Sequence, residues 1–334
     1  MNYLKNIKRR LINMFPILFD PLAMNLNKQE DVLKLARVVR KMAETGIGTD
    51  ACLELGCLPM LVNFYSAVPD IKDLKNRHLW DKRRNMVGID FQPERQLAFL
   101  AQLGQEYGDE CKWPLKPTNN PTEFYLDNGN FSFGCAASLH VILRHFQPHC
   151  VVEIGSGNSS KVISKALSLN ANKSEYNIID PYPNDVTKNK LPCVTQLIEE
   201  RVELVDLDFF CKIGKDDILF IDSGHTVRTG SDVNFLILEV LPRLAPGAIV
   251  HFHDINMPYE YPEVYFTNPQ FRVFWTEDYL LQAFLTHNSQ FEILLALSYL
   301  QANHMDIFCQ TFPHFDLSTN WANSGSFWIR RKLS

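Results

Sequence analysis

From about residue 137 onward, short runs of apolar residues alternate with longer segments whose apolar residues recur at helical spacing. Short runs that are apolar throughout are typical of strands buried on both faces of a parallel sheet. Strands are predicted at residues 150–154, 176–180, 201–205, 217–222, 248–253, 291–300 and 325–331. The pattern therefore predicts an α/β fold with a doubly wound, Rossmann-like sheet of seven strands.

Helices are predicted between most of these strands, among them residues 194–200 and 232–244. No strong helical segment separates the last two strands. We therefore expect the last strand to run antiparallel at one edge of the sheet.

The first third of the chain has a different pattern. Residues 28–46 and 92–108 show apolar positions at helical spacing, and the stretch between them is rich in aromatic and turn residues. Three prolines and two asparagines at 112–122 indicate a connector. We expect a mainly helical accessory region over 1–115 and the sheet domain over 116–334.

The N-terminus combines a basic cluster with four apolar residues at helical spacing, which are Leu4, Ile7, Leu11 and Met14. The apolar run is broken by Pro16, so it is too short for a bilayer, which needs about 20 apolar residues. A helix docked on its own domain or on a partner is one interpretation. The other is an interfacial helix in peripheral contact with anionic lipid at the inner face of a membrane.

Composition narrows the class of protein. Hydrophobic residues make up 46% of the chain and charged residues 21%, as in ordinary globular proteins. The net charge of −5 gives no basic surface, which argues against a nucleic-acid partner. The eight cysteines include no CxxC pair, so we expect free thiols and a cytoplasmic protein.

Polar residues follow two of the central strands. Asp222 ends the apolar run "ILFI", His225 follows three residues later, and His253 and Asp254 close the next strand. Sites in open α/β sheets lie outside the carboxyl ends of the strands, so these residues are expected to converge. A histidine with a pKa of about 6.5 is suited to act as a base. Asp222 could instead accept backbone N–H groups of the following turn.

The stretch "VVEIGSGNSS" places Glu153, Gly155 and Gly157 directly after the first strand. Glycines permit a tight turn and close approach of a ligand to the backbone. The third glycine of a dinucleotide fingerprint is replaced by Ser160, which argues against NAD. Asp180 ends the second strand, where an acid commonly accepts hydrogen bonds from ribose hydroxyls.

These motifs resemble the class I adenosylmethionine-dependent methyltransferases over about residues 125–334. The resemblance implies S-adenosyl-L-methionine as the cofactor. Its methionine part would lie against the glycine loop, its ribose against the acid of the second strand, and its adenine near an acid after the third. The cofactor-binding residues implied in this way are Glu153, Gly155, Ser156, Gly157, Asp180, Asp206 and Phe133.

More narrowly, "NGNFSFGCAASLHVIL" and the segment from "DILFIDSGH" to "HFHDI" resemble a bacterial subfamily of mostly uncharacterised members, some of them found near genes for surface-sugar assembly. Metal-dependent sugar O-methyltransferases are similar at the two strand ends. This resemblance implies His225 and Asp222 as catalytic residues, and Mg²⁺ or Mn²⁺ held by Asp222, His253 and Asp254. His253 departs from the related pattern, which usually has an acid there.

The favoured function is therefore O-methylation of a sugar or another small hydroxylated acceptor, in polysaccharide biosynthesis by this resemblance, with His225 as base. Tyr259, Tyr261 and Trp275 are candidates for the acceptor pocket, although aromatic residues there are as often packing. An interaction protein of a glycan-assembly system that binds the cofactor is a second hypothesis, and an NAD-type oxidoreductase a third. An amine acceptor and a homo-oligomer stay open.

Overall fold

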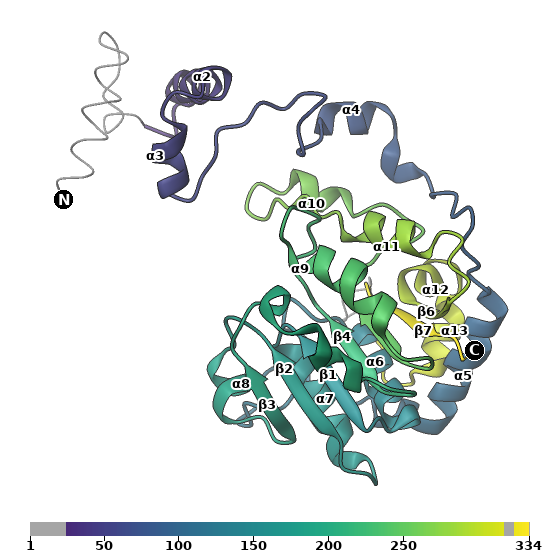
Figure 1. Cartoon of the computed structure of the whole chain (residues 1–334). Coiled ribbons are helices and arrows are strands. Elements are labelled where there is room, and N and C mark those ends of the chain that lie inside the picture. Colours follow the sequence, from purple (N-terminus) through teal and green to yellow (C-terminus); the bar gives the residue numbers. More distant parts are fainter. Residues whose placement is uncertain (1–24, 317–323, 334) are drawn as a thin grey trace. The chain divides into compact units, whose positions relative to one another are not determined.

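The computed structural model describes residues 25–316 and 324–333 of the chain. The chain divides into two compact units, residues 1–78 and 79–334, and each is described here by itself (Figure 1). The N-terminal segment for which a docked or interfacial helix is predicted lies outside the described residues.

The described part of the first unit is mainly helical, as expected. It contains α2 (Gln29–Thr45), α3 (Thr49–Glu54) and α4 (Ile71–Asn76). The predicted helix at 28–46 is confirmed as α2, which ends at Gly46 in the left-handed conformation, with φ at 70°. Asp70 caps α4, because its side chain accepts from two backbone N–H groups of the first turn.

The predicted domain boundary at 115 does not coincide with the division between the two units. Helix α5 (Pro93–Tyr107) belongs to the larger unit, where it packs against α6 (Phe133–Phe146) and strand β6 (Phe291–Ala296). Leu100 and Leu103 of α5 are completely buried in the core of that unit. The proline-rich stretch at 112–122 therefore lies within the larger unit.

The larger unit is built on one sheet whose seven strands are in the described part of the chain. Its strands are β1 (Cys150–Ile154), β2 (Glu175–Ile179), β3 (Val194–Ile198), β4 (Ile218–Ile221), β5 (Ile249–Phe252), β6 and β7 (Phe327–Arg331). Their order is β3-β2-β1-β4-β5-β7-β6, and β7 runs antiparallel to both of its neighbours. The predicted fold class and the antiparallel last strand are confirmed.

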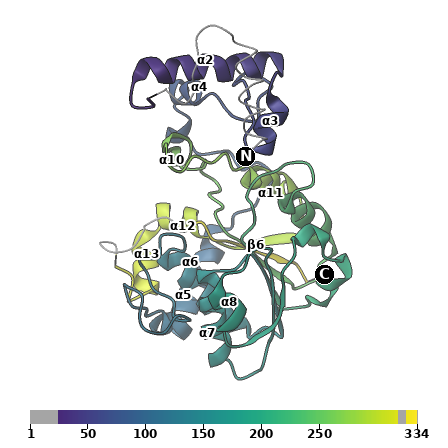
Figure 2. The same cartoon turned by 90° about the vertical axis from the view of Figure 1, so that its left-hand side faces the viewer.

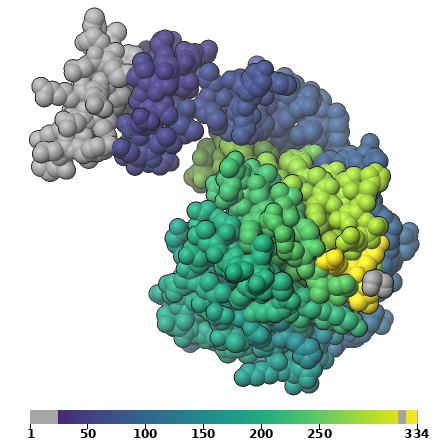
Figure 3. Space-filling view, viewed as in Figure 1, coloured from purple at the N-terminus to yellow at the C-terminus, as the bar shows by residue number. Residues whose placement is uncertain are grey.

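Helices cover both faces of the sheet, which explains why β1, β4 and β5 are buried along their whole length. On one face α5, α6 and α7 (Asn158–Leu169) pack side by side, and α13 (Met305–Thr311) packs on α5 (Figure 2). On the other face a π-helix (Phe235–Val240) contacts α11 (Glu277–Leu285). The teal, green and yellow segments of this unit form a continuous packed surface in Figure 3.

Shorter helices connect these layers. They are α8 (Asp185–Asn189), α9 (Asp232–Asn234), α10 (Glu263–Thr267), α12 (Leu297–Asn303) and the 3-10 turns Leu79–Asp81, Gly108–Glu110, Val202–Leu204, Leu207–Lys212 and Leu241–Arg243. The helix predicted at 232–244 is thus present as three successive pieces of α, π and 3-10 geometry.

The third strand lies seven residues earlier than its prediction. Residues 194–200 were expected to be helical and 201–205 to be the strand, but the strand is Val194–Ile198 and 202–204 forms a 3-10 turn. β3 is an edge strand that pairs only with β2; Thr195 and Gln196 are exposed, and none of its five residues is fully buried. A strand at an edge lacks the continuous apolar run that marks the central strands. The apolar residues of the following 3-10 turn give the stronger strand signal in the sequence, so the prediction falls on them.

Two other properties concern the whole described chain. Among the helices in its described parts, none has the length and apolar character to cross a bilayer. All eight cysteines are free thiols, as predicted.

Candidate functional site

The loops after β1 and β4 meet at the point where the strand order reverses. Asp222 N donates to the carbonyl of Ile154 at 3.0 Å, so Asp222 begins where β1 ends. Gly155 has φ at 79°, and a Cβ on it would overlap the carbonyl oxygen of Asp222. Only glycine allows this approach, which fixes the first loop directly beside the second.

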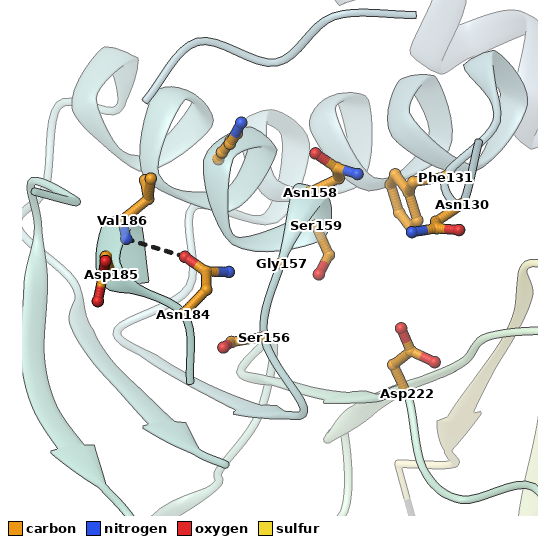
Figure 4. A pocket seen from close by; sticks show the side chains of 11 residues that line it. Asn130, Phe131, Ser156, Gly157, Asn158, Ser159, Asn184, Asp185, Val186 and Asp222 are labelled. Carbon is orange, nitrogen blue, oxygen red and sulfur yellow. Dashed lines mark hydrogen bonds between the residues drawn. The ribbon is translucent and has the colours of Figure 1, made fainter. Parts of the chain in front are cut away.

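A cavity of about 590 Å³ opens at this switch point. Ser156 and Gly157 of the glycine loop form one part of its wall, and Asn184, at the start of α8, forms another. In Figure 4 Asp222 lies at the far end of the same cavity, below the ring of Phe131. The glycine loop and the first polar residue of β4 therefore face one space, as the sequence predicted.

Glu153 does not line this cavity, although it was predicted to lie against the cofactor. Its side chain is completely buried, and it accepts hydrogen bonds from Ser159 Oγ at 2.7 Å, from Ser160 Oγ at 3.1 Å and from the Tyr176 hydroxyl. Burial raises the pKa of Glu153 to about 7, against the lowering effect of these three donors. In this structure the carboxyl joins β1, β2 and the start of α7.

Asp180 supports the glycine loop from the end of β2. It accepts a hydrogen bond from Ser156 Oγ at 2.6 Å and another from Tyr182 N at 2.8 Å. Its side chain therefore orients Ser156, which does line the cavity. A role with ribose, as implied by the resemblance, stays a prediction.

The two other residues predicted for the cofactor lie outside the cavity wall. Asp206 is exposed and caps the 3-10 turn that follows it by accepting from Asp208 N at 2.9 Å. Phe133 is buried in the core against Trp113. Phe131, two residues earlier in "FSF", lines the cavity in its place. Helix α6 begins at Phe133, and the side chain of that residue is buried.

The carboxyl ends of β4 and β5 bring the predicted polar residues together. His253 Nδ1 lies 3.5 Å from Asp222 Oδ1 and 3.4 Å from Asp254 Oδ2. His225 Nε2 lies 3.2 Å from Asp222 Oδ1 and 3.8 Å from Asp254 Oδ2. The two strands are paired in register up to Ile221, so the next residue of each is held beside the other.

Glu277 completes this network and was not found from the sequence. It lies at the start of α11, is 1% exposed, and accepts from His225 Nδ1 at 2.8 Å. Its other oxygen accepts from Ser223 Oγ at 2.9 Å. A carboxylate can only accept, so Nδ1 of His225 carries a proton and Nε2 is left facing Asp222. In sequence Glu277 looks like an ordinary acidic residue in the first turn of a helix, and no local signal distinguishes it.

Both imidazoles of the network favour the protonated form. Burial alone would lower the pKa of His225, but hydrogen bonds and charge from Asp222 and Glu277 outweigh it and raise the pKa to about 10. The pKa of His253 is likewise raised well above its usual value, against burial, by Asp254 and Asp222. In return, and again against burial, the charge of His253 holds the pKa of Asp222 well below its usual range.

The residues as arranged do not fit a metal ion, although Asp222, His253 and Asp254 do converge. No group of three or more His, Cys, Asp or Glu side chains among residues 25–316 and 324–333 could hold one. The imidazoles of His225 and His253 stand beside the carboxylate oxygens and favour protonation, whereas a histidine ligand must be unprotonated. We therefore derive no step from a metal.

Aromatic residues stand beside His225 on the side of α10 and α11. The ring of Trp275 lies 4.4 Å from that of His225, and Tyr265 lies 5.0 Å from Trp275. Tyr261 is buried and accepts from Asp278 N at 3.0 Å, so it is a packing residue. Tyr259 contacts Asn303, whose side chain donates to its hydroxyl. Of the three aromatic candidates, Trp275 is the one that contacts the histidine.

Comparison with known proteins agrees with this geometry. Residues 152–255 match a family described as methyltransferase domain. That range begins in β1 and ends just after Asp254, so it contains the glycine loop and both central strand ends. An uncharacterised protein of Archaeoglobus fulgidus is 33% identical over 161 residues, which cover 44% of this chain and 70% of that protein.

Solved structures with some likeness include a methyltransferase from Geobacter sulfurreducens, which is 15% identical with a TM-score of 0.34 and covers 71% of this chain and 89% of its own. Another is the Podospora anserina methyltransferase PaMTH1 bound to SAH, 14% identical with a TM-score of 0.35, covering 83% of this chain and all of its own. At these TM-scores neither carries weight for this chain.

The family match and the fold of the sheet are consistent with each other without the solved structures. The sheet has the seven strands and the antiparallel last strand that the resemblance to class I enzymes implies. The matched domain contains the residues that surround the cavity at its switch point except Asn130 and Phe131, which precede it. The chain therefore contains a methyltransferase domain, which residues 152–255 form on the central strands of the sheet.

Proposed function

We propose that the protein methylates a hydroxyl group of a small acceptor, such as a sugar, with His225 as the base. One observation carries this proposal. Asp222 lines the cavity beside the glycine loop and also lies 3.2 Å from His225 Nε2. A single side chain thus separates the space suited to the cofactor from a histidine suited to hold the acceptor proton.

The cavity fits adenosylmethionine in the chemistry of its wall. The glycine loop and the start of α7 supply backbone N–H groups for a carboxylate, and Asn184 and Asp185 supply polar groups for hydroxyls and an amino group. When bound, this cofactor supplies a methyl group on a sulfonium; the acceptor oxygen takes the methyl, and the electron pair of the broken C–S bond stays on sulfur.

His225 would receive the hydroxyl proton at Nε2. Glu277 holds the opposite nitrogen and fixes the plane of the ring, as the orienting acid does in other histidine bases. Trp275 packs against the same ring and excludes water from that side. Asp222 then stabilises the imidazolium that results.

A base must be neutral before it acts, and the pKa of His225 is about 10 in the protein without cofactor. The network holds two imidazoles that favour protonation among three carboxylates. A positive charge in the cavity beside Asp222 would weaken the electrostatic attraction between Asp222 and protonated His225. The pKa of His225 would then fall. The base is thus expected to become available when the cavity is filled.

The test has two parts. Calorimetric titration with adenosylmethionine and adenosylhomocysteine measures binding, and transfer of labelled methyl to a panel of free and nucleotide-linked hexoses and catechols measures the reaction. His225→Gln should abolish transfer and keep binding, whereas His149→Gln, at the opposite end of β1, should change neither. No binding by the wild-type protein, or full transfer by His225→Gln, would refute the proposal.

A further inference from the structure

We infer that Arg84 is a positioning residue for His225 and acts through the first turns of α11. The inference rests on the proposed function of His225. Arg84 lies 68 residues before the matched methyltransferase domain begins, in a segment for which the sequence indicates no function. Its side chain is nevertheless only 13% exposed, and it contacts two separate parts of the acceptor side of the site.

The first part is the loop after β5. The backbone N–H of Arg84 donates to the carbonyl of Pro258 at 2.9 Å, and its Nη2 donates to the carbonyl of Tyr259 at 2.6 Å. Nε lies 3.6 Å from Glu260 Oε1. Three consecutive residues of the loop that leads away from His253 and Asp254 are therefore held by one arginine.

The second part is helix α11. Nη2 of Arg84 lies 3.0 Å from Asp278 Oδ2, and Nη1 donates to Gln282 Oε1 at 2.7 Å. The guanidinium also lies over the ring of Tyr279, 5.2 Å from its centroid. These contacts extend over the first two turns of the helix, so the guanidinium fixes the position and rotation of its N-terminal end.

The N-terminal end of α11 carries Glu277, the hydrogen-bond partner of His225. Glu277 directly precedes Asp278 and points the other way, to His225 Nδ1. The backbone N–H groups of Thr276 and Glu277 both donate to the carbonyl of His225, at 2.8 and 3.1 Å. A displacement of the first turn would therefore move both the ring and the backbone contacts of His225.

A second contact from the same segment supports this role. Trp80 Nε1 donates to the carbonyl of Tyr261 at 2.9 Å, and the hydroxyl of Tyr261 accepts from Asp278 N at 3.0 Å. The segment 80–84 thus reaches Asp278 along two routes, one through its carboxylate and one through its backbone. Lysine could not reproduce the Arg84 route, because a single ammonium lacks the planar fork that spans Asp278 and Gln282.

The test uses full-length protein labelled with ¹⁵N at histidine. The ring Nδ1–H signal of His225, assigned with His225→Gln, reports the hydrogen bond to Glu277 directly. In Arg84→Met this signal should be lost or exchange with solvent at least about tenfold faster, as in Glu277→Ala, which removes the acceptor. The neighbouring Arg83→Met should leave it unchanged, because the exposed Arg83 side chain lies over Tyr299. An unchanged signal in Arg84→Met would overturn the inference.

Two further measurements exclude a general loss of structure. Arg84→Met should bind adenosylmethionine within about twofold of wild type, and in Arg84→Ala added guanidinium chloride at millimolar concentration should restore the ring signal. If Arg84→Met does not fold because Asp278 is left unpaired, Arg84→Met/Asp278→Asn removes both charges. A normal ring signal in that double variant would overturn the inference. Failure of the wild-type protein to bind adenosylmethionine would refute the proposed function alone, because the ring signal needs no cofactor.

Discussion

The two sides of the site differ in how the chain builds them. The cofactor side comes from a nearly continuous stretch: the glycine loop, the end of β2 and the start of α8 lie within residues 153–186, and Phe131 is close before them. The acceptor side is assembled from segments around residues 84, 225, 254 and 277. A local site leaves a motif in the sequence, whereas a site assembled from distant segments leaves isolated charged residues.

The largest expected effect separates the two sides completely. His225→Gln should lower methyl transfer about 10²- to 10⁴-fold, because it removes the proposed base. Adenosylmethionine affinity should stay within about twofold of wild type, since His225 does not line the cavity. Single-turnover kinetics gives the rate of methyl transfer and calorimetry gives the affinity, both on the same variant. A parallel loss of binding would show that the two sides are not separable.

A matching change on the cofactor side should have the reverse pattern. Gly155→Ala places a methyl group against the carbonyl oxygen of Asp222 and forces a left-handed backbone on alanine. We expect adenosylmethionine affinity to fall about tenfold or more and the free energy of unfolding to fall by about 1–3 kcal/mol. Gly129→Ala is the control, because Gly129 has a similar positive φ but no atom near its added methyl. Equal losses in both variants would attribute the effect to backbone strain alone.

The pH dependence of methyl transfer should test the role of His225 on the acceptor side. In the proposed reaction His225 acts in its neutral form, and its pKa is raised to about 10 before the cofactor binds, so kcat/KM for the cofactor should rise with pH from neutrality upward. Glu277→Gln removes one of the two carboxylates that raise this pKa. The rising limb of the rate profile should therefore move to lower pH by about one unit in Glu277→Gln. A limb that moves upward, or does not move, would contradict the assignment.

The free energy of unfolding should also depend on the protonation of His225, but it should fall with pH where methyl transfer rises. The raised pKa of His225 stabilises the folded protein fully below the unfolded pKa of about 6.5, and this contribution is lost as pH rises through about 10. Urea denaturation between pH 6.5 and 10 should show the free energy of unfolding falling more steeply in wild type than in His225→Gln. Parallel curves would mean that the histidine is not held in its charged form.

The smallest expected effect concerns metal ions. Because the imidazoles stand where an ion would lie, EDTA should change methyl transfer by less than about twofold, and added Mg²⁺ should not raise it. Transfer that disappears in EDTA and returns with Mg²⁺ would show that the carboxylates exchange their histidine partners for an ion. The earlier metal hypothesis would then be restored.

Much of the fold could be predicted because β1, β4 and β5 are buried on both faces and have continuous apolar sequences. The prediction for β3 is wrong because an edge strand without fully buried residues lacks that signature. Asp222 and His225 stood out as charged or titratable residues directly after an apolar strand. Glu277 and Arg84 did not, because their importance comes from contacts between residues 52 and about 190 positions apart. Sequence periodicity reports the burial of a residue but not the identity of its distant partner.

The burial of Leu100 and Leu103 has a practical consequence for anyone who wishes to produce part of this protein. A fragment that begins at the proline-rich stretch near 115 would lose α5, expose the face of α6 that packs on it and leave β6 without the helix that covers it. It would also lose Arg84 and leave Asp278 as a buried carboxylate without its cation. The shortest fragment expected to be handled as a stable protein begins near residue 79 and keeps the C-terminal strand.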